Sequence, residues 1–307
     1  MTLFSPRPLG RMLAIWPLGR TLRRIALAAV LTLPASPAFA EEAADISGAQ
    51  RIVAIGGSVT EIVYALGEEG RLVARDSTSG FPQAATELPD VGYMRALSPE
   101  GVLSVKPDAI LMLEGSGPPE ALAVLREAGV PYVSVPETFD RAGILGKIEK
   151  VGEAIGAGDK AAKLAEQVGA ELDAAVTEAK ALGREARVLF ILSMNGGRIL
   201  ASGTGTAANG MIELAGATNA MGVFEGYKQI NDEALIAAAP DVILMISRGE
   251  GHTASAEQVF ANASLAQTPA GQNKRLIQMD GLYLIGFGPR TGAAVRDLSA
   301  ALAGMGL

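Results

Sequence analysis

The chain has 307 residues, of which 49% are hydrophobic, and it carries 26 Lys and Arg against 33 Asp and Glu. It has no cysteine, which excludes a disulfide framework, thiol catalysis and cysteine-based metal sites. The net charge of −7 argues against nucleic acid and anionic membrane surfaces as partners.

The first 40 residues have the organisation of a secretory signal peptide. Five arginines precede an apolar run at residues 25–33, and Ala38-Phe39-Ala40 forms a small-residue cleavage site. The alternative is a transmembrane anchor, but the run is shorter than the roughly 20 residues that span a bilayer. Cleavage after Ala40 would leave 21 of the 26 Lys and Arg against 33 Asp and Glu, a net charge of −12. We therefore expect a soluble, exported protein, best suited to a periplasm.

Residues 41–139 are predicted to form an N-terminal α/β lobe. Apolar runs rich in β-branched residues predict buried strands, at residues 51–55, 72–74, 109–113 and 131–135. Helical patterns separate them, and Ser58 with Glu61 fits a capping box that would begin the first helix. Alternating strands and helices are typical of a parallel sheet covered by helices.

Residues 140–183 show two apolar stripes at helical spacing and no strand pattern, which predicts a helical spine. A coiled-coil dimer is the alternative, but the stripes are short and rich in Ala and Gly. Residues 184–307 return to alternating elements, with a strand at 187–192, a hairpin partner at 199–201 and a helix at 206–215. The predicted fold is α/β, with two Rossmann-like lobes of parallel-rich sheets joined by the long helical spine.

An internal repeat supports two similar lobes. Residues 97–112 align without a gap with residues 230–245, so that Glu100 matches Glu233 and Pro107-Asp108 matches Pro240-Asp241. Each copy reads as a loop, a helix, a Pro-Asp pair and a strand.

The usual catalytic signatures are missing from the sequence. There is no phosphate-binding G-x-x-x-x-G-K-[ST] motif and no G-x-S-x-G nucleophile elbow. His252 is the single histidine, so a catalytic triad or a multi-histidine metal site would have to use it. Two similar lobes with an export signal instead favour a solute receptor, whose ligand we expect between the lobes at the carboxyl ends of strands.

The stretch Val91-Gly92-Tyr93-Met94-Arg95-Ala96-Leu97-Ser98-Pro99-Glu100 resembles the signature loop of periplasmic haem-binding proteins that feed ABC-type haem importers. Residues 266–271 and 286–291 are also similar to that family, and the resemblance covers residue 51 to the C-terminus. It implies a class III periplasmic binding protein that carries haem in the periplasm. The implied partners are an ABC permease with its ATPase, and an outer-membrane haem receptor system upstream. We expect a monomer.

The resemblance implies that Tyr93 coordinates the haem iron. A phenolate is a hard anionic ligand suited to ferric iron, and tyrosine is an established axial ligand. The tyrosine pKa, about 10 in free peptides, must fall for the phenolate to bind at neutral pH, and iron and a nearby guanidinium both lower it. The resemblance points to Arg248 for that guanidinium. Arg95 would do the same or pair with a haem propionate.

Met94, Met194 and Tyr227 are candidates for an apolar wall against the porphyrin, with simple core packing as the alternative for the methionines. His252 is expected to be an ordinary loop residue, with a second iron ligand or a site for a second haem as alternatives. Glu100 and Glu233 are expected to meet arginines of the permease. The compatible alternative is that both acids stabilise their helices through the helix dipole.

Two other functions stay open. A ferric-siderophore or cobalamin receptor would share this architecture but would not need a bond from tyrosine to iron. A periplasmic haem-processing enzyme would need turnover and a proton donor such as His252. We expect a receptor and not an enzyme.

Overall fold

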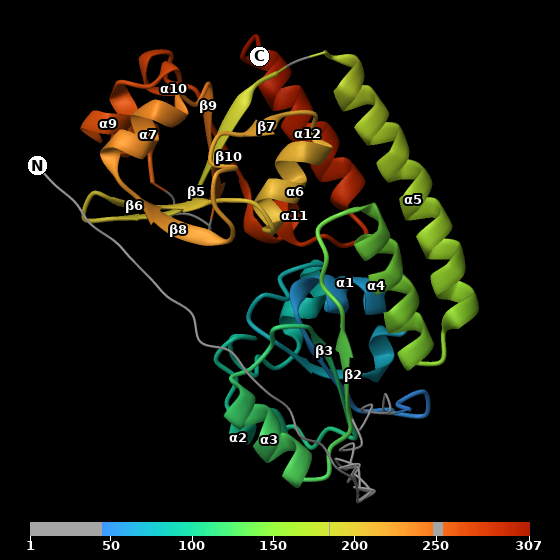
Figure 1. The fold of residues 1–307 in the computed structure, drawn as a ribbon. Coiled ribbons are helices and arrows are strands. Elements are labelled where there is room, and N and C mark those ends of the chain that lie inside the picture. Colours follow the sequence, from blue (N-terminus) through green and yellow to red (C-terminus); the bar gives the residue numbers. More distant parts are fainter. Residues whose placement is uncertain (1–44, 184, 248–253) are drawn as a thin grey trace, which may run out of the picture. The chain divides into compact units, whose positions relative to one another are not determined.

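The computed structural model describes residues 45–183, 185–247 and 254–307, and they form two separate β-sheets with helices around them (Figure 1). The predicted signal peptide lies outside the described residues. The first sheet has four strands in the order β2-β1-β3-β4, and every pair is parallel. Its strands are β1 (Ile52–Ile55), β2 (Leu72–Arg75), β3 (Ala109–Leu113) and β4 (Tyr132–Val135).

The second sheet is mixed. Its order is β10-β9-β5-β6-β8, with the short β7 beside β5; β10, β9, β5 and β7 run parallel, whereas β6 and β8 run antiparallel. The strands are β5 (Arg187–Asn195), β6 (Arg198–Ser202), β7 (Thr218–Asn219), β8 (Tyr227–Ile230), β9 (Val242–Ser247) and β10 (Leu276–Asp280). The hairpin expected at residues 199–201 is therefore confirmed as β6.

Helices α4 (Arg141–Ala154) and α5 (Gly158–Ala181) lie within residues 140–183, the stretch predicted to lack strands, and pack against each other. The C-terminal helix α12 (Thr291–Gly304) also packs against α5. The apolar stripes are buried here, including Ile144, Ile148, Val168 and Leu172. The other helices are α1 (Gly57–Ala65), α2 (Pro99–Ser104), α3 (Pro119–Glu127), α6 (Ala207–Leu214), α7 (Asp232–Ala238), α8 (Ala256–Phe260), α9 (Ala263–Ala266), α10 (Pro269–Gln272) and α11 (Gly281–Ile285), and the short 3₁₀ helices are η1 (Glu69–Arg71) and η2 (Gln83–Glu87). This arrangement confirms the predicted α/β fold class.

The sequence repeat is also a structural repeat. The N-cap residues Ser98 and Asn231 accept the backbone N–H three residues later, at 3.2 and 2.8 Å, as expected for short polar N-caps. After each helix, the residue before the Pro-Asp pair has a left-handed backbone. The aspartates then accept backbone N–H groups at the start of β1 and β5, Asp108 from Arg51 at 2.9 Å and Asp241 from Arg187 at 2.9 Å. Each copy therefore ties its strand to the first strand of its own sheet.

The capping box predicted at Ser58 and Glu61 is wrong. Helix α1 begins at Gly57, after Gly56, and no side chain caps it. The Glu61 side chain instead accepts two hydrogen bonds from Arg290, both at 3.0 Å, and the Ser58 hydroxyl accepts from Lys147 at 3.2 Å. Long-range partners outcompete the local cap because the carboxylate is buried and needs a charged partner.

Within the described part of the chain, no helix is both long and apolar enough to cross a membrane.

Candidate functional site

The loop that carries Tyr93 starts at the carboxyl edge of the first sheet. The chain leaves β2 at Arg75, crosses η2, and returns beside Arg75 at Asp90 through a parallel bridge. The Arg75 N–H donates to Pro89 at 3.0 Å, and the Val91 N–H donates to Arg75 at 3.0 Å. Residues 92–97 therefore continue past the edge where parallel α/β sheets usually bind ligands.

Backbone hydrogen bonds fix the loop on both sides of Tyr93. Before it, the Gly92 carbonyl accepts from Ser77 at 2.9 Å. After it, the Met94 carbonyl accepts from Gly117 at 2.8 Å, and the Leu97 N–H donates to the Gly117 carbonyl at 2.9 Å. The loop after β3 thus holds the far side of the Tyr93 loop.

Gly92 has a φ of 101°, a backbone conformation that L side chains rarely adopt. A Cβ at this position would meet no heavy atom within 4 Å, so the requirement for glycine is conformational and not one of space.

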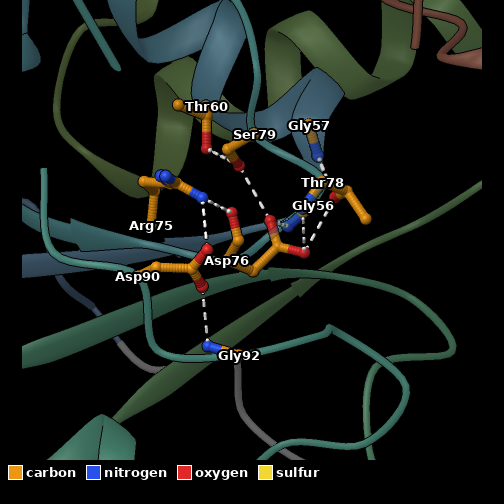
Figure 2. Close-up of polar contacts among 9 residues, drawn as sticks. All are labelled: Gly56, Gly57, Thr60, Arg75, Asp76, Thr78, Ser79, Asp90 and Gly92. Carbon is orange, nitrogen blue, oxygen red and sulfur yellow. Dashed lines mark hydrogen bonds and ion pairs between the residues drawn. The ribbon is translucent and has the colours of Figure 1, made fainter. Parts of the chain in front are cut away.

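A polar network lies under this loop (Figure 2). The carboxylate of Asp90 accepts from the Gly92 N–H at 2.8 Å with one oxygen and from Arg75 at 2.7 Å with the other. The neighbouring Asp76 is fully buried, and its carboxylate accepts from the Gly56 N–H at 3.0 Å and from the hydroxyls of Thr78 and Ser79, both at 2.8 Å. The end of β2 is therefore locked to the start of α1.

The two predicted site residues at the centre of the loop point in different directions. The Tyr93 side chain is 48% exposed, whereas Met94 is 8% exposed and belongs to the main hydrophobic core. The loop is thus anchored by Met94 and presents a phenol to solvent. An exposed phenol oxygen can coordinate a hard metal ion or take part in a hydrogen bond.

Arg95 is exposed, and its charge reaches groups from both sheets. Burial raises the pKa of Tyr227, and hydrogen bonds to Thr206 and the Ala208 backbone, with the charge of Arg95, oppose that rise. Burial likewise raises the pKa of Glu137, against the charges of Lys147 and Arg95. Burial therefore makes Tyr227, whose ring centre lies 6.4 Å from that of Phe190, harder to deprotonate.

Met194 is half-buried on β5, against the smaller core of the second sheet. Glu100 and Glu233 are both exposed, each the second residue of its short helix. The Ser98 hydroxyl donates to Glu100 at 2.8 Å and, with the Glu100 backbone N–H, lowers the pKa of that carboxyl. Arg248 and His252 lie outside the described residues. Among the described residues, no group of three or more His, Asp and Glu could hold a metal ion.

A second charged cluster was not anticipated from the sequence. Lys147 on α4 is 1% exposed, and its ammonium donates to Glu137 at 2.5 Å, to Ser58, and to the Phe287 carbonyl at 3.0 Å. Burial lowers the pKa of Lys147. The sequence does contain an indication that Lys147 is buried, because Lys147 comes three residues after Ile144 and so lies on the same apolar helix face. A lysine on an apolar stripe indicates a buried partner.

The chain matches the model of the family described as periplasmic binding protein over residues 52–282. It belongs to that family. Among solved structures, the periplasmic haem-binding protein BhuT in complex with two haems is 39% identical, with a TM-score of 0.79 over 83% of this chain and 98% of that chain. The apo form of the periplasmic haem-binding protein RhuT from Roseiflexus sp. RS-1 is 37% identical, with a TM-score of 0.80 over 85% and 100% of the two chains.

A further relative is the uncharacterised ABC transporter substrate-binding lipoprotein YvrC of Bacillus subtilis (strain 168). It is 28% identical over 256 residues, which cover 82% of this chain and 80% of YvrC. Together these matches confirm both the class of fold and the resemblance to periplasmic haem-binding proteins seen in the sequence.

Proposed function

We propose that this protein is a periplasmic receptor that binds ferric haem through the Tyr93 phenolate and delivers it to an ABC importer. The observation that carries the proposal is the exposed Tyr93 phenol on a loop whose backbone is fixed on both sides. The similarity to haem-binding BhuT and RhuT over nearly their whole length supports haem as the ligand. In this role haem is cargo, and the receptor performs no chemistry on it.

The surroundings of Tyr93 suit a porphyrin with two carboxylate groups. Arg95 is exposed next to the ligand position and offers a planar guanidinium for a propionate. In this proposal Tyr227 and the half-buried Met194 would supply aromatic and thioether surface for the ring. Met94, being 8% exposed, contributes through the position of the loop more than through its own surface.

The ligand assignment is tested with hemin and a pair of tyrosine variants. Hemin added to the purified apo-protein should shift its Soret absorption. Tyr93→Phe should change that spectrum, because it keeps the ring but removes the oxygen that binds iron. Tyr227→Phe is the matched control and should keep the wild-type ligand signature. A wild-type spectrum in Tyr93→Phe would refute ligation by Tyr93.

The same titration separates the other functions. Its break point gives the number of haems bound per chain. Tighter binding of a ferric siderophore or of cobalamin than of hemin would reassign the ligand. A new pigment formed from bound haem on repeated turnover would show an enzyme.

Docking to the importer is proposed to use Glu100 and Glu233. They are exposed at equivalent positions of the structural repeat. Hydrogen bonds from Ser98 and from the Glu100 backbone N–H lower the pKa of Glu100, which favours the charged form that pairs with arginines. The relation to an ABC transporter substrate-binding protein supports this partner. Replacing both glutamates by alanine should leave hemin affinity unchanged but reduce haem uptake in a reconstituted importer. Unchanged uptake would refute the docking proposal.

Export is proposed to remove residues 1–40. Mass determination of the protein recovered from the periplasm should give a chain that begins at Glu41. Recovery of the full-length chain in the membrane fraction would contradict cleavage.

A further inference from the structure

The pair formed by Arg75 and Asp90 sits between the first sheet and the Tyr93 loop. Arg75 is the last residue of β2, and its guanidinium donates to Asp90 at 2.7 Å and to the Asp76 carbonyl at 3.1 Å (Figure 2). The other oxygen of Asp90 accepts from the Gly92 N–H at 2.8 Å. One carboxylate therefore links strand β2 to the backbone N–H of Gly92, the residue directly before Tyr93.

The pair is poorly explained as a source of stability. The Arg75 side chain is 13% exposed and that of Asp90 is 42% exposed, so water still screens the pair from the Asp90 side and it contributes less to folding than a fully buried pair. In addition, the buried Nε of Arg75 has no hydrogen-bond partner among the described residues, which is unfavourable for a polar atom removed from water. A guanidinium kept under those conditions is better explained by what it holds in place.

Through Asp90, the Arg75 guanidinium holds Gly92, whose backbone is left-handed. Gly92 has a φ of 101°, and its N–H and carbonyl are bound to Asp90 and Ser77 respectively. A change in the backbone dihedral angles of Gly92 would swing the next side chain, that of Tyr93, away from any fixed iron position. Groups that orient a metal ligand from outside typically change metal affinity by about 10–100-fold when they are removed.

We propose that Asp90, itself held by Arg75, is a positioning residue for the Tyr93 iron ligand. The inference rests on the proposed function, since it concerns the bond between Tyr93 and haem iron. Asp90 does not touch the haem. It fixes the backbone N–H of Gly92, and so restrains the backbone that leads to Tyr93. The phenolate is then already aimed when haem arrives, and haem binding loses less conformational entropy.

The test compares haem loss from four full-length variants. Haem transfer to an excess of a haem-scavenging apoprotein gives the dissociation rate, and the vibrational band of the bond between iron and phenolate reports ligation directly. Asp90→Ala should raise the dissociation rate about tenfold and weaken or broaden that band, a change of about 1.4 kcal/mol in barrier. Asp90→Asn should raise the rate less, because its amide oxygen still accepts from Gly92.

Two controls keep the outcomes distinct. Asp108→Ala also removes a carboxylate that accepts backbone N–H groups, from Gln50 and Arg51, but at the opposite, amino-terminal edge of the sheet. It should lower the unfolding midpoint without speeding haem loss. Tyr93→Phe should abolish the phenolate band. If it does not, the proposed function fails, whatever the Asp90 variants do.

The positioning role is overturned by any of three results, given a band that disappears in Tyr93→Phe. These are a dissociation rate in Asp90→Ala within about twofold of wild type, an effect of Asp90→Asn as large as that of Asp90→Ala, and an equal effect in Asp108→Ala. The first would show that Asp90 has no role in ligation. The second would show that the hydrogen bond to Gly92 is not the cause, and the third that general destabilisation is.

Discussion

The pair formed by Glu61 and Arg290 gives the sharpest stability prediction. It joins α1, next to the first sheet, to the residue that precedes α12, through two parallel hydrogen bonds of 3.0 Å. The side chains are 6% and 26% exposed. The Arg290 guanidinium also lies 3.6 Å from the ring centre of Phe81.

The size of the effect follows from burial. Arg290→Ala leaves the buried Glu61 carboxylate without its charged partner, which typically costs about 3–5 kcal/mol. It also removes a contact between a cation and an aromatic ring worth about 0.5–1 kcal/mol at an exposed site. Lys147 still acts on Glu61, because the Glu61 charge opposes the lowering of the Lys147 pKa that burial causes. We therefore expect a loss of about 3 kcal/mol, the low end of the range for a buried pair.

The chain offers a matched exposed pair. Arg141 donates two hydrogen bonds to Asp173 in the same bidentate geometry, at 2.7 and 2.9 Å, but these side chains are 51% and 57% exposed. Urea unfolding followed by circular dichroism, in a double-mutant cycle for each pair, gives the interaction energies. We expect about 2 kcal/mol for the buried pair and 0.2–1 kcal/mol for the exposed one. Equal energies would refute the reasoning that burial sets the strength.

Three further outcomes are expected in unfolding experiments. On α4, Gly152→Ala should destabilise the protein, because a Cβ there would lie 2.1 Å from a side chain of α5. At Gly146 a Cβ would meet nothing within 4 Å, so Gly146→Ala should stabilise the protein by up to about 1 kcal/mol. A higher melting temperature for Gly152→Ala than for Gly146→Ala would contradict this packing. Tyr283 donates to Asp297 at 2.8 Å, and burial with this bond raises its pKa to about 12. The contribution of protonated Tyr283 to stability is present below pH 10 and is lost as pH rises towards about 12. Tyr283→Phe should therefore reduce the decline of the urea midpoint with rising alkaline pH. An unchanged decline would argue against the raised pKa of Tyr283. Asn231→Ala should cost about 1 kcal/mol through loss of the α7 N-cap, while Asn231→Ser should restore most of it.

Local pattern determined most of the fold from the sequence alone. Continuous apolar runs marked β1, β3, β5 and β9 because strands buried on both faces need no polar alternation. The repeat predicted the same loop, helix, Pro-Asp pair and strand in both copies. The structure adds that the helix caps and the aspartate hydrogen bonds are also equivalent. The Tyr93 loop was singled out by its resemblance to a family and not by local pattern, and the role of Tyr93 as an iron ligand stays a prediction.

Tertiary structure alone decided the partners of the buried charges. Glu61 reads as a local cap in sequence, but it binds Arg290, a residue 229 positions away. Lys147 reads as one polar residue in an apolar stripe, but its ammonium joins α4 to Glu137, Ser58 and the segment before α12. A buried charge takes whichever opposite charge packing brings near, because desolvation outweighs local preference. The spacing of residues in the sequence does not indicate which opposite charge packing will bring near.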